Sequence, residues 1–202
     1  SLSFDIMRIT NNGSFAYSPM SSVMVKHTIT VAVRAPENGM PVPGVDRMAG
    51  FTRTMYDIVR KVVVPAVGWA TSLAPAIQFG FTPLICEADK DTYGLDLEHL
   101  ERLLKKHRPA TVLMVQVLGV PHKMDEILRL KRKYGFFLLE DACAAAGAEY
   151  KGRKAGTFGD MASFSAYFGH QFSTIEGGIV STDDKGFSDL LLMLRSHGWS
   201  KD

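Results

Sequence analysis

Short apolar runs alternate with longer amphipathic segments between residues 61 and 141. The runs lie at residues 62–65, 83–86, 111–119 and 136–141, and each has the composition of a strand that is buried on both faces. In the segments between them, apolar positions recur every three or four residues. This alternation predicts an α/β domain with a mostly parallel sheet and helices on both of its faces.

The ends of the predicted helices are marked by residue type. Segment 95–107 places leucines on one face and lysines in its last turn, where cations interact favourably with the helix dipole. Thr71 or Ser72 is expected to cap an earlier helix, which would accommodate Pro75 in its first turn and end at Gly80.

The alternation of predicted strands and helices ends after residue 141. Glycines that favour turns precede two short predicted strands, one near residues 161–167 and one near residues 177–183. Between them lies a loop rich in serine and glycine, and an amphipathic helix that ends at Gly198 follows. Residues 61–202 therefore form the readable domain.

Residues 1–60 show neither a helical nor an alternating period. Clusters of proline and glycine, such as PENGMPVPG at residues 36–44, mark turns. The segment is a poorly readable amino-terminal part of the chain.

Composition narrows the class of protein. Of the 202 residues, 46% are hydrophobic and 22% charged, with a formal net charge of +2, which is typical of a soluble globular protein and gives little support to nucleic-acid binding. Cys86 and Cys143 are far apart, and neither they nor the histidines have metal-ligand spacing, so we expect a reducing compartment and no metal site. Without a signal-peptide pattern or a membrane-length apolar run, we expect a cytoplasmic location and no membrane partner.

Asp141 and Trp69 each follow a predicted strand at its carboxyl end, where ligands bind in open parallel sheets. The carboxylate of Asp141 could hold a protonated ring nitrogen, or it could cap a helix or form a surface ion pair. Trp69 could stack on a flat cofactor ring or be an ordinary core residue.

The loop region 163–178, SFSAYFGHQFSTIEGG, carries the remaining candidates. Ser165, together with neighbouring hydroxyl and glycine residues, suits a phosphate group, although turn formation explains the same composition. His170 could take up and release protons near neutrality, or it could be structural.

The motifs VPAVGWATSLAPAIQFG, LLEDACAAAGAEYKGRKAGTFGDMASFSAYF, STIEGGIVSTDD and LRSHGW occur in this order. They resemble the DegT/DnrJ/EryC1/StrS family of vitamin B6-dependent sugar aminotransferases over residues 60–202. The resemblance implies the large domain of the aspartate-aminotransferase fold (fold type I of pyridoxal phosphate enzymes). It also implies a homodimer and a smaller carboxyl-terminal domain that is missing here. Asp141 would bind the pyridine nitrogen, Trp69 would stack on the ring and Ser165 would hold the phosphate.

His170 stands where aminotransferases of this family carry the lysine that binds the cofactor covalently, and the chain has no lysine between Lys154 and Lys185. The context FGHQFSTIEGG is similar to that of family members that remove the 3-hydroxyl group of a GDP-linked 4-keto-6-deoxy sugar. The resemblance implies that glutamate converts pyridoxal 5'-phosphate to pyridoxamine 5'-phosphate and that His170 is the catalytic base acting on a nucleotide-linked sugar.

Two departures from the family keep other readings open. The dehydratases carry a glutamate three residues after the strand-end aspartate, where this chain has Ala144. The family's Gly-Ser phosphate loop is not recognisable in residues 1–60. An inactive fragment or non-catalytic relative is therefore one alternative, and an iron–sulfur CDP-sugar 3-dehydratase is a less favoured one. A plain aminotransferase is disfavoured without the lysine.

Overall fold

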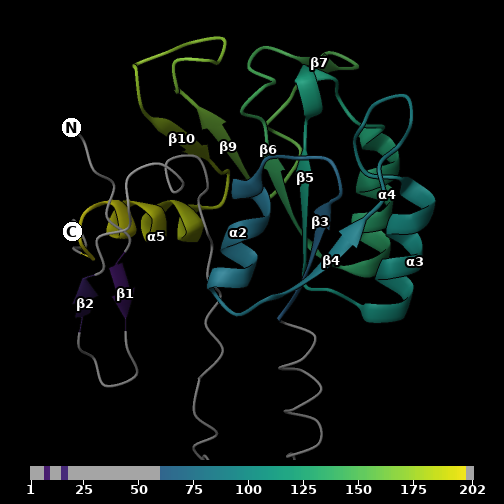
Figure 1. The fold of residues 1–202 in the computed structure, drawn as a ribbon, viewed down its shortest axis with the longest axis horizontal. Helices are drawn as coiled ribbons and strands as arrows, with labels where there is room; N and C mark the ends of the chain where they lie inside the picture. The colour runs from purple at the N-terminus through teal and green to yellow at the C-terminus, as the bar shows by residue number, and fades with distance from the viewer. Residues whose placement is uncertain (1–6, 10–14, 18–59, 199–202) are drawn as a thin grey trace, which may run out of the picture.

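A computed structural model describes residues 7–9, 15–17 and 60–198 of the chain. Its centre is a six-stranded sheet in the order β10-β9-β6-β5-β3-β4, which is parallel except for β10 (Figure 1). The strands of this sheet are β3 (Lys61–Pro65), β4 (Thr82–Cys86), β5 (Thr111–Val115), β6 (Phe137–Asp141), β9 (Met161–Ser165) and β10 (Gly178–Ser181). The expected α/β architecture with a mostly parallel sheet is confirmed.

The connections from β3 to β4, from β4 to β5 and from β5 to β6 each contain a helix, as the apolar pattern predicts. They are α2 (Ala70–Gln78), α3 (Leu97–His107) and α4 (Met124–Tyr134), and α5 (Lys185–Arg195) follows β10. Three short elements complete the region after residue 60: the 3-10 turn Val117–Gly119 and the hairpin strands β7 (Glu149–Tyr150) and β8 (Arg153–Lys154). No helix among the described residues is long and apolar enough to cross a membrane.

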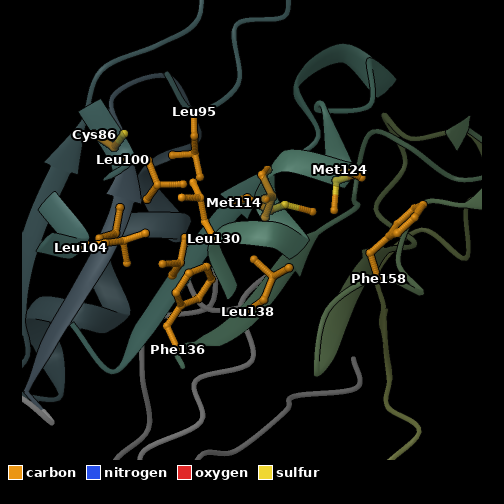
Figure 2. Packing of buried hydrophobic residues seen from close by; sticks show 13 residues of the cluster. Cys86, Leu95, Leu100, Leu104, Met114, Met124, Leu130, Phe136, Leu138 and Phe158 are labelled. Atoms are coloured by element: carbon orange, nitrogen blue, oxygen red, sulfur yellow. The ribbon is translucent and has the colours of Figure 1, made fainter. Parts of the chain in front are cut away.

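The main core lies between the sheet and the helix pair α3–α4, which Figure 1 shows together on one side of the sheet. Alternate strand residues point toward these helices, because successive side chains of a strand face opposite ways. Figure 2 shows the packing of this cluster, in which Leu100 and Leu104 of α3 and Leu130 of α4 are buried with Met114 and Leu138 of the strands.

The opposite face of the sheet is covered by α2. Val62 and Val64 of β3 pack there with Ala76 of α2, whereas Val63 belongs to the α3–α4 core. The same alternation in β6 sends Glu140 toward α4 and Asp141 toward α2. The two adjacent carboxylates therefore have different surroundings.

The start of α2 differs from the expectation. The helix begins at Ala70 with Trp69 as its N-cap, and no side chain caps it, so neither Thr71 nor Ser72 is the cap. Pro75 lies inside the helix and not in its first turn. The hydroxyl group of Ser72 has a partner elsewhere in the fold, which explains why it does not cap its own helix.

The amino-terminal segment contains one described pair of strands. Met7–Ile9 (β1) and Phe15–Tyr17 (β2) form an antiparallel pair. Most of residues 1–60, where the family's phosphate loop would be expected, lies outside the described residues.

Candidate functional site

Asp141 ends β6 at the carboxyl edge of the sheet, and its carboxylate is held by two donors. The Ser72 hydroxyl of α2 donates to Oδ2 at 3.1 Å, and the main-chain N–H of Cys143 donates to Oδ1 at 3.1 Å. The Cys143 side chain also bonds to this carboxylate, which with about four acceptor sites retains capacity for a further donor. The carboxylate is oriented and remains able to bind a cationic N–H group.

Trp69 lies three residues before the serine that binds Asp141. Its side chain is 73% exposed, so the reading of Trp69 as a core residue is wrong. Because Ser72 ties the first turn of α2 to Asp141, the indole stands at the same edge of the sheet as the carboxylate. A flat, exposed aromatic side chain at the same edge of the sheet as an oriented carboxylate fits a protonated heteroaromatic ring.

Ser165 ends β9, the strand next to β6. Asp141 pairs in register with Ser163, so Ser163 and Ser165 share the face of the sheet toward which Asp141 points. Ser165 is buried, and its Oγ accepts a hydrogen bond from the main-chain N–H of Tyr167 at 3.2 Å. Its hydroxyl hydrogen can be donated to a ligand oxygen, as binding of a phosphate would require.

His170 lies in the loop 166–177 between β9 and β10, which Figure 1 shows at the top of the sheet. Its main-chain N–H donates to the carbonyl of Tyr167 at 3.1 Å, and its side chain is half-buried. The next residue, Gln171, donates from Nε2 to the carbonyl oxygen of Ala144 at 2.5 Å. This bond joins the histidine loop to the loop that begins at Asp141.

Cys143 adjoins the site without being a nucleophile for it. Burial, with the nearby charge of Asp141 as a second cause, raises the pKa of the Cys143 thiol far above its ordinary value. Since only the thiolate is strongly nucleophilic, this side chain stays protonated and unreactive at neutral pH.

A buried polar network supports the site from the α4 side of the sheet. Glu140 is 1% exposed and accepts hydrogen bonds from Gln116 Nε2 at 3.3 Å and from the main-chain N–H groups of Gly156, Phe158 and Gly159. Sequence reasoning missed this role of Glu140. A signal existed, because a glutamate inside a strand covered on both faces must be buried and must find donors.

The parallel sheet, the helix-covered faces and the polar groups at its carboxyl edge define the chain as an aminotransferase-like α/β protein. Its fold matches an aminotransferase from Psychrobacter cryohalolentis with a TM-score of 0.67 and 27% identity, over 73% of this chain and 38% of that one. The model of the DegT/DnrJ/EryC1/StrS aminotransferase family matches residues 54–202, and the chain belongs to this family.

Two further comparisons concern dehydratases of the family. The chain is 39% identical over 142 residues to GDP-4-keto-6-deoxy-D-mannose 3-dehydratase of Yersinia pseudotuberculosis, covering 70% of this chain and 36% of the relative. It is 36% identical, with a TM-score of 0.64, to a crystal structure of GDP-4-keto-6-deoxymannose-3-dehydratase with a trapped PLP-glutamate geminal diamine, covering 70% and 36% of the two chains. The chain thus spans about a third of the length of these relatives.

Proposed function

We propose that this chain belongs to a 3-dehydratase that uses pyridoxamine 5'-phosphate on a nucleotide-linked 4-keto-6-deoxy sugar, with glutamate as amino donor and His170 as base. The observation that carries the proposal is the composition of the loop between β9 and β10. It contains an imidazole at residue 170, and no lysine occurs between Lys154 and Lys185. Similarity to two GDP-sugar 3-dehydratases supports the same reaction and a GDP-linked substrate.

The residues at the carboxyl edge of the sheet fit the cofactor. Bound pyridoxamine phosphate would supply an amine for the keto carbon of the sugar and a ring that withdraws electrons. The Asp141 carboxylate, oriented by Ser72, would hold the positive charge of the pyridine nitrogen. Trp69 would lie against the ring face, and the Ser165 hydroxyl would donate to the phosphate.

His170 would move the proton. An imidazole can accept a proton from carbon and return it to a leaving hydroxyl group. It has no primary amine and therefore cannot bind the cofactor covalently as a lysine does. The cofactor amine stays available to the sugar.

The proposed partner is a second copy of the chain. Large apolar side chains are exposed on the loops that follow β3, β5 and β9, at the edge of the sheet that carries the candidate site. They are Val67, Trp69, Leu118, Val120, Phe168, Phe172 and Ile175. An apolar rim around a polar site supports a homodimer with the site close to the interface.

The test is incubation of the chain with glutamate, pyridoxal 5'-phosphate and GDP-4-keto-6-deoxymannose. The expected products are ammonia and 2-oxoglutarate. His170→Asn should abolish ammonia release and leave cofactor binding, followed by absorbance, unchanged. Near-normal turnover of His170→Asn would show that His170 is not the base.

Ala144 favours a second candidate, a non-catalytic relative that keeps the scaffold. Titration with pyridoxamine 5'-phosphate separates the two. A shift in cofactor absorbance without ammonia release supports the non-catalytic relative, and the absence of any shift contradicts both candidates. Turnover of a CDP-linked sugar in place of the GDP-linked one would instead support the CDP-sugar alternative.

A further inference from the structure

Three loops at the carboxyl edge of the sheet meet at the carbonyl oxygen of Ala144. Gln171 Nε2 donates to this oxygen at 2.5 Å from the loop after β9. Gly119, in the turn after β5, approaches it so closely that an added Cβ would lie 2.8 Å away. The oxygen therefore lies between the 3-10 turn and the histidine loop, and a change on either side would displace it.

The base of the histidine loop is closed by its own main chain. The N–H of Ala166 donates to the carbonyl of Gly177 at 2.9 Å, and the N–H of Thr174 donates to the carbonyl of Ala166 at 3.0 Å. His170 lies beyond both of these bonds, toward the tip of the loop. The side chain of its neighbour Gln171 reaches the adjacent loop from this tip.

The bond made by Gln171 connects the tip to Asp141. Ala144 follows Asp141 by three residues, and the intervening Cys143 donates its main-chain N–H to the Asp141 carboxylate. A short path of bonds thus runs from that carboxylate through residues 143 and 144 to Gln171 and so to His170. The main chain next to His170 is thus linked to the carboxylate that would fix the cofactor ring.

We infer that Gln171 is a positioning residue, which holds the imidazole of His170 in place through the carbonyl of Ala144. The inference rests on the proposed role of His170 as base. A base must stay within hydrogen-bond reach of the proton it removes, and a misplacement of about 1 Å can lower the rate about 100-fold. Because the acceptor is a main-chain oxygen, the contact does not depend on which side chain occupies position 144.

The test uses the Gln171→Glu variant of the chain. A carboxylate cannot donate to the Ala144 carbonyl and is repelled by it, so the tip should loosen. Gln78→Glu is the matched control, because Gln78 is an exposed residue near the carboxyl end of α2, at the opposite end of that helix from Ser72.

The first readout needs neither cofactor nor substrate. Amide hydrogen exchange of residues 169–172 should become about fivefold faster in Gln171→Glu, as expected for the loss of one hydrogen bond, and should not change in Gln78→Glu. The second readout is kinetic: kcat should fall by roughly 10- to 100-fold with cofactor affinity unchanged.

Gly119→Ala tests the same contact from the other side. Its Cβ would lie 2.8 Å from the Ala144 carbonyl oxygen, its φ of 78° adds strain in the turn itself, and the residues of the histidine loop stay unchanged. Faster exchange at residues 169–172 in this variant supports the inference, provided that its melting temperature shows a folded chain. Exchange in Gln171→Glu equal to that of the control contradicts the contact. Faster exchange with unchanged kcat contradicts the positioning role. If His170→Asn keeps its turnover while exchange rises in Gln171→Glu, the contact stands and the proposed function fails.

Discussion

Adjacent carboxylates at residues 140 and 141 show how strand alternation assigns different chemistry to neighbours. Asp141 faces α2 and accepts hydrogen bonds from the hydroxyl group of Ser72 and from Cys143. Glu140 faces α4 and is surrounded by donors that the protein itself supplies. Asp141 can therefore still bind a ligand, whereas the hydrogen bonds of Glu140 stabilise the fold.

The buried residue His122 gives the chain a predictable pH dependence. Its Nδ1 accepts from the N–H of Leu95 at 3.3 Å, so Nε2 carries the hydrogen and donates to the carbonyl of Val115 at 2.7 Å. Burial lowers the pKa of His122 below its ordinary value of 6.5, although the Val115 carbonyl and Asp89 oppose this shift. Protonation of Nδ1 would also be unfavourable, because the new N–H would point at the N–H of Leu95 and the hydrogen bond between them would be lost.

The unfolded chain therefore takes up this proton at a higher pH than the folded chain does. Stability from neutral His122 is complete above the unfolded pKa and falls as the pH drops below it toward the folded pKa. We expect the urea concentration at the unfolding midpoint to decrease as the pH is lowered from about 7.5 to about 5.5. His122→Gln should reduce this fall, and His197→Gln, at an exposed position, should retain it; a full wild-type fall in His122→Gln would contradict the assignment.

At the scale of elements, Glu140 connects β6 to the segment that leads into β9. Its Oε1 accepts from the N–H groups of Phe158 and Gly159 at 2.5 Å each, and its Oε2 accepts from the N–H of Gly156 at 2.9 Å. The carboxylate thereby fixes the approach of β9, which carries Ser165, to β6, which carries Asp141.

Glu140→Gln should weaken this connection strongly. The new amide group would face N–H donors on one side and leave at least one of them without an acceptor. Since an unsatisfied buried donor costs about 1–3 kcal/mol, we expect a loss of roughly 2–4 kcal/mol in the free energy of unfolding. Urea denaturation measures it, with Glu98→Gln at an exposed position of α3 as the control, and equal midpoints for the two variants would rule out the role.

The order of strands and helices after residue 60 was predictable from the sequence because each buried strand is a short apolar run. The ends of the helices and strands were harder to predict. The run 111–119 suggests one long strand, but β5 stops at Val115 because Gln116 turns its amide to the buried Glu140 and Leu118 adopts a left-handed conformation with φ of 53°. Such contacts between distant residues leave no local pattern.

The candidate site was predictable only in part. Asp141, Trp69, Ser165 and His170 follow from strand ends and from the family motifs. The roles of Ser72 and Gln171 could not be predicted, because their hydrogen-bond partners are 69 and 27 residues away in the chain. Thr71 and Ser72 looked like helix caps because serine and threonine favour that position, and a tertiary hydrogen bond overrides this local preference.

At the scale of the whole molecule, the apolar side chains around the site bear on the proposed homodimer. Leu118 is 79% exposed and follows β5 at the carboxyl edge of the sheet. An exposed leucine on a left-handed turn contributes little to the fold of one chain, so its replacement tests assembly more than folding.

Leu118→Glu should shift the chain toward monomer in sedimentation velocity, because a buried, unpaired charge opposes association. Ile77→Glu is the control, as Ile77 is 60% exposed near the carboxyl end of α2, away from the site. Identical sedimentation of the two variants would argue against an interface at Leu118.

The two outermost strands of the sheet, which form its margins, differ in how readily they can pair with a further strand. At one margin β4, which among the strands that the structure describes pairs with β3 alone, contains Pro83, a residue that lacks an amide hydrogen and suits an edge strand. At the other margin, among the described strands, β10 pairs with β9 alone, and Ile179 is largely exposed. A further extended segment could therefore continue the hydrogen-bond ladder along β10 far more readily than along β4, which makes β10 the margin to shield when the chain is concentrated.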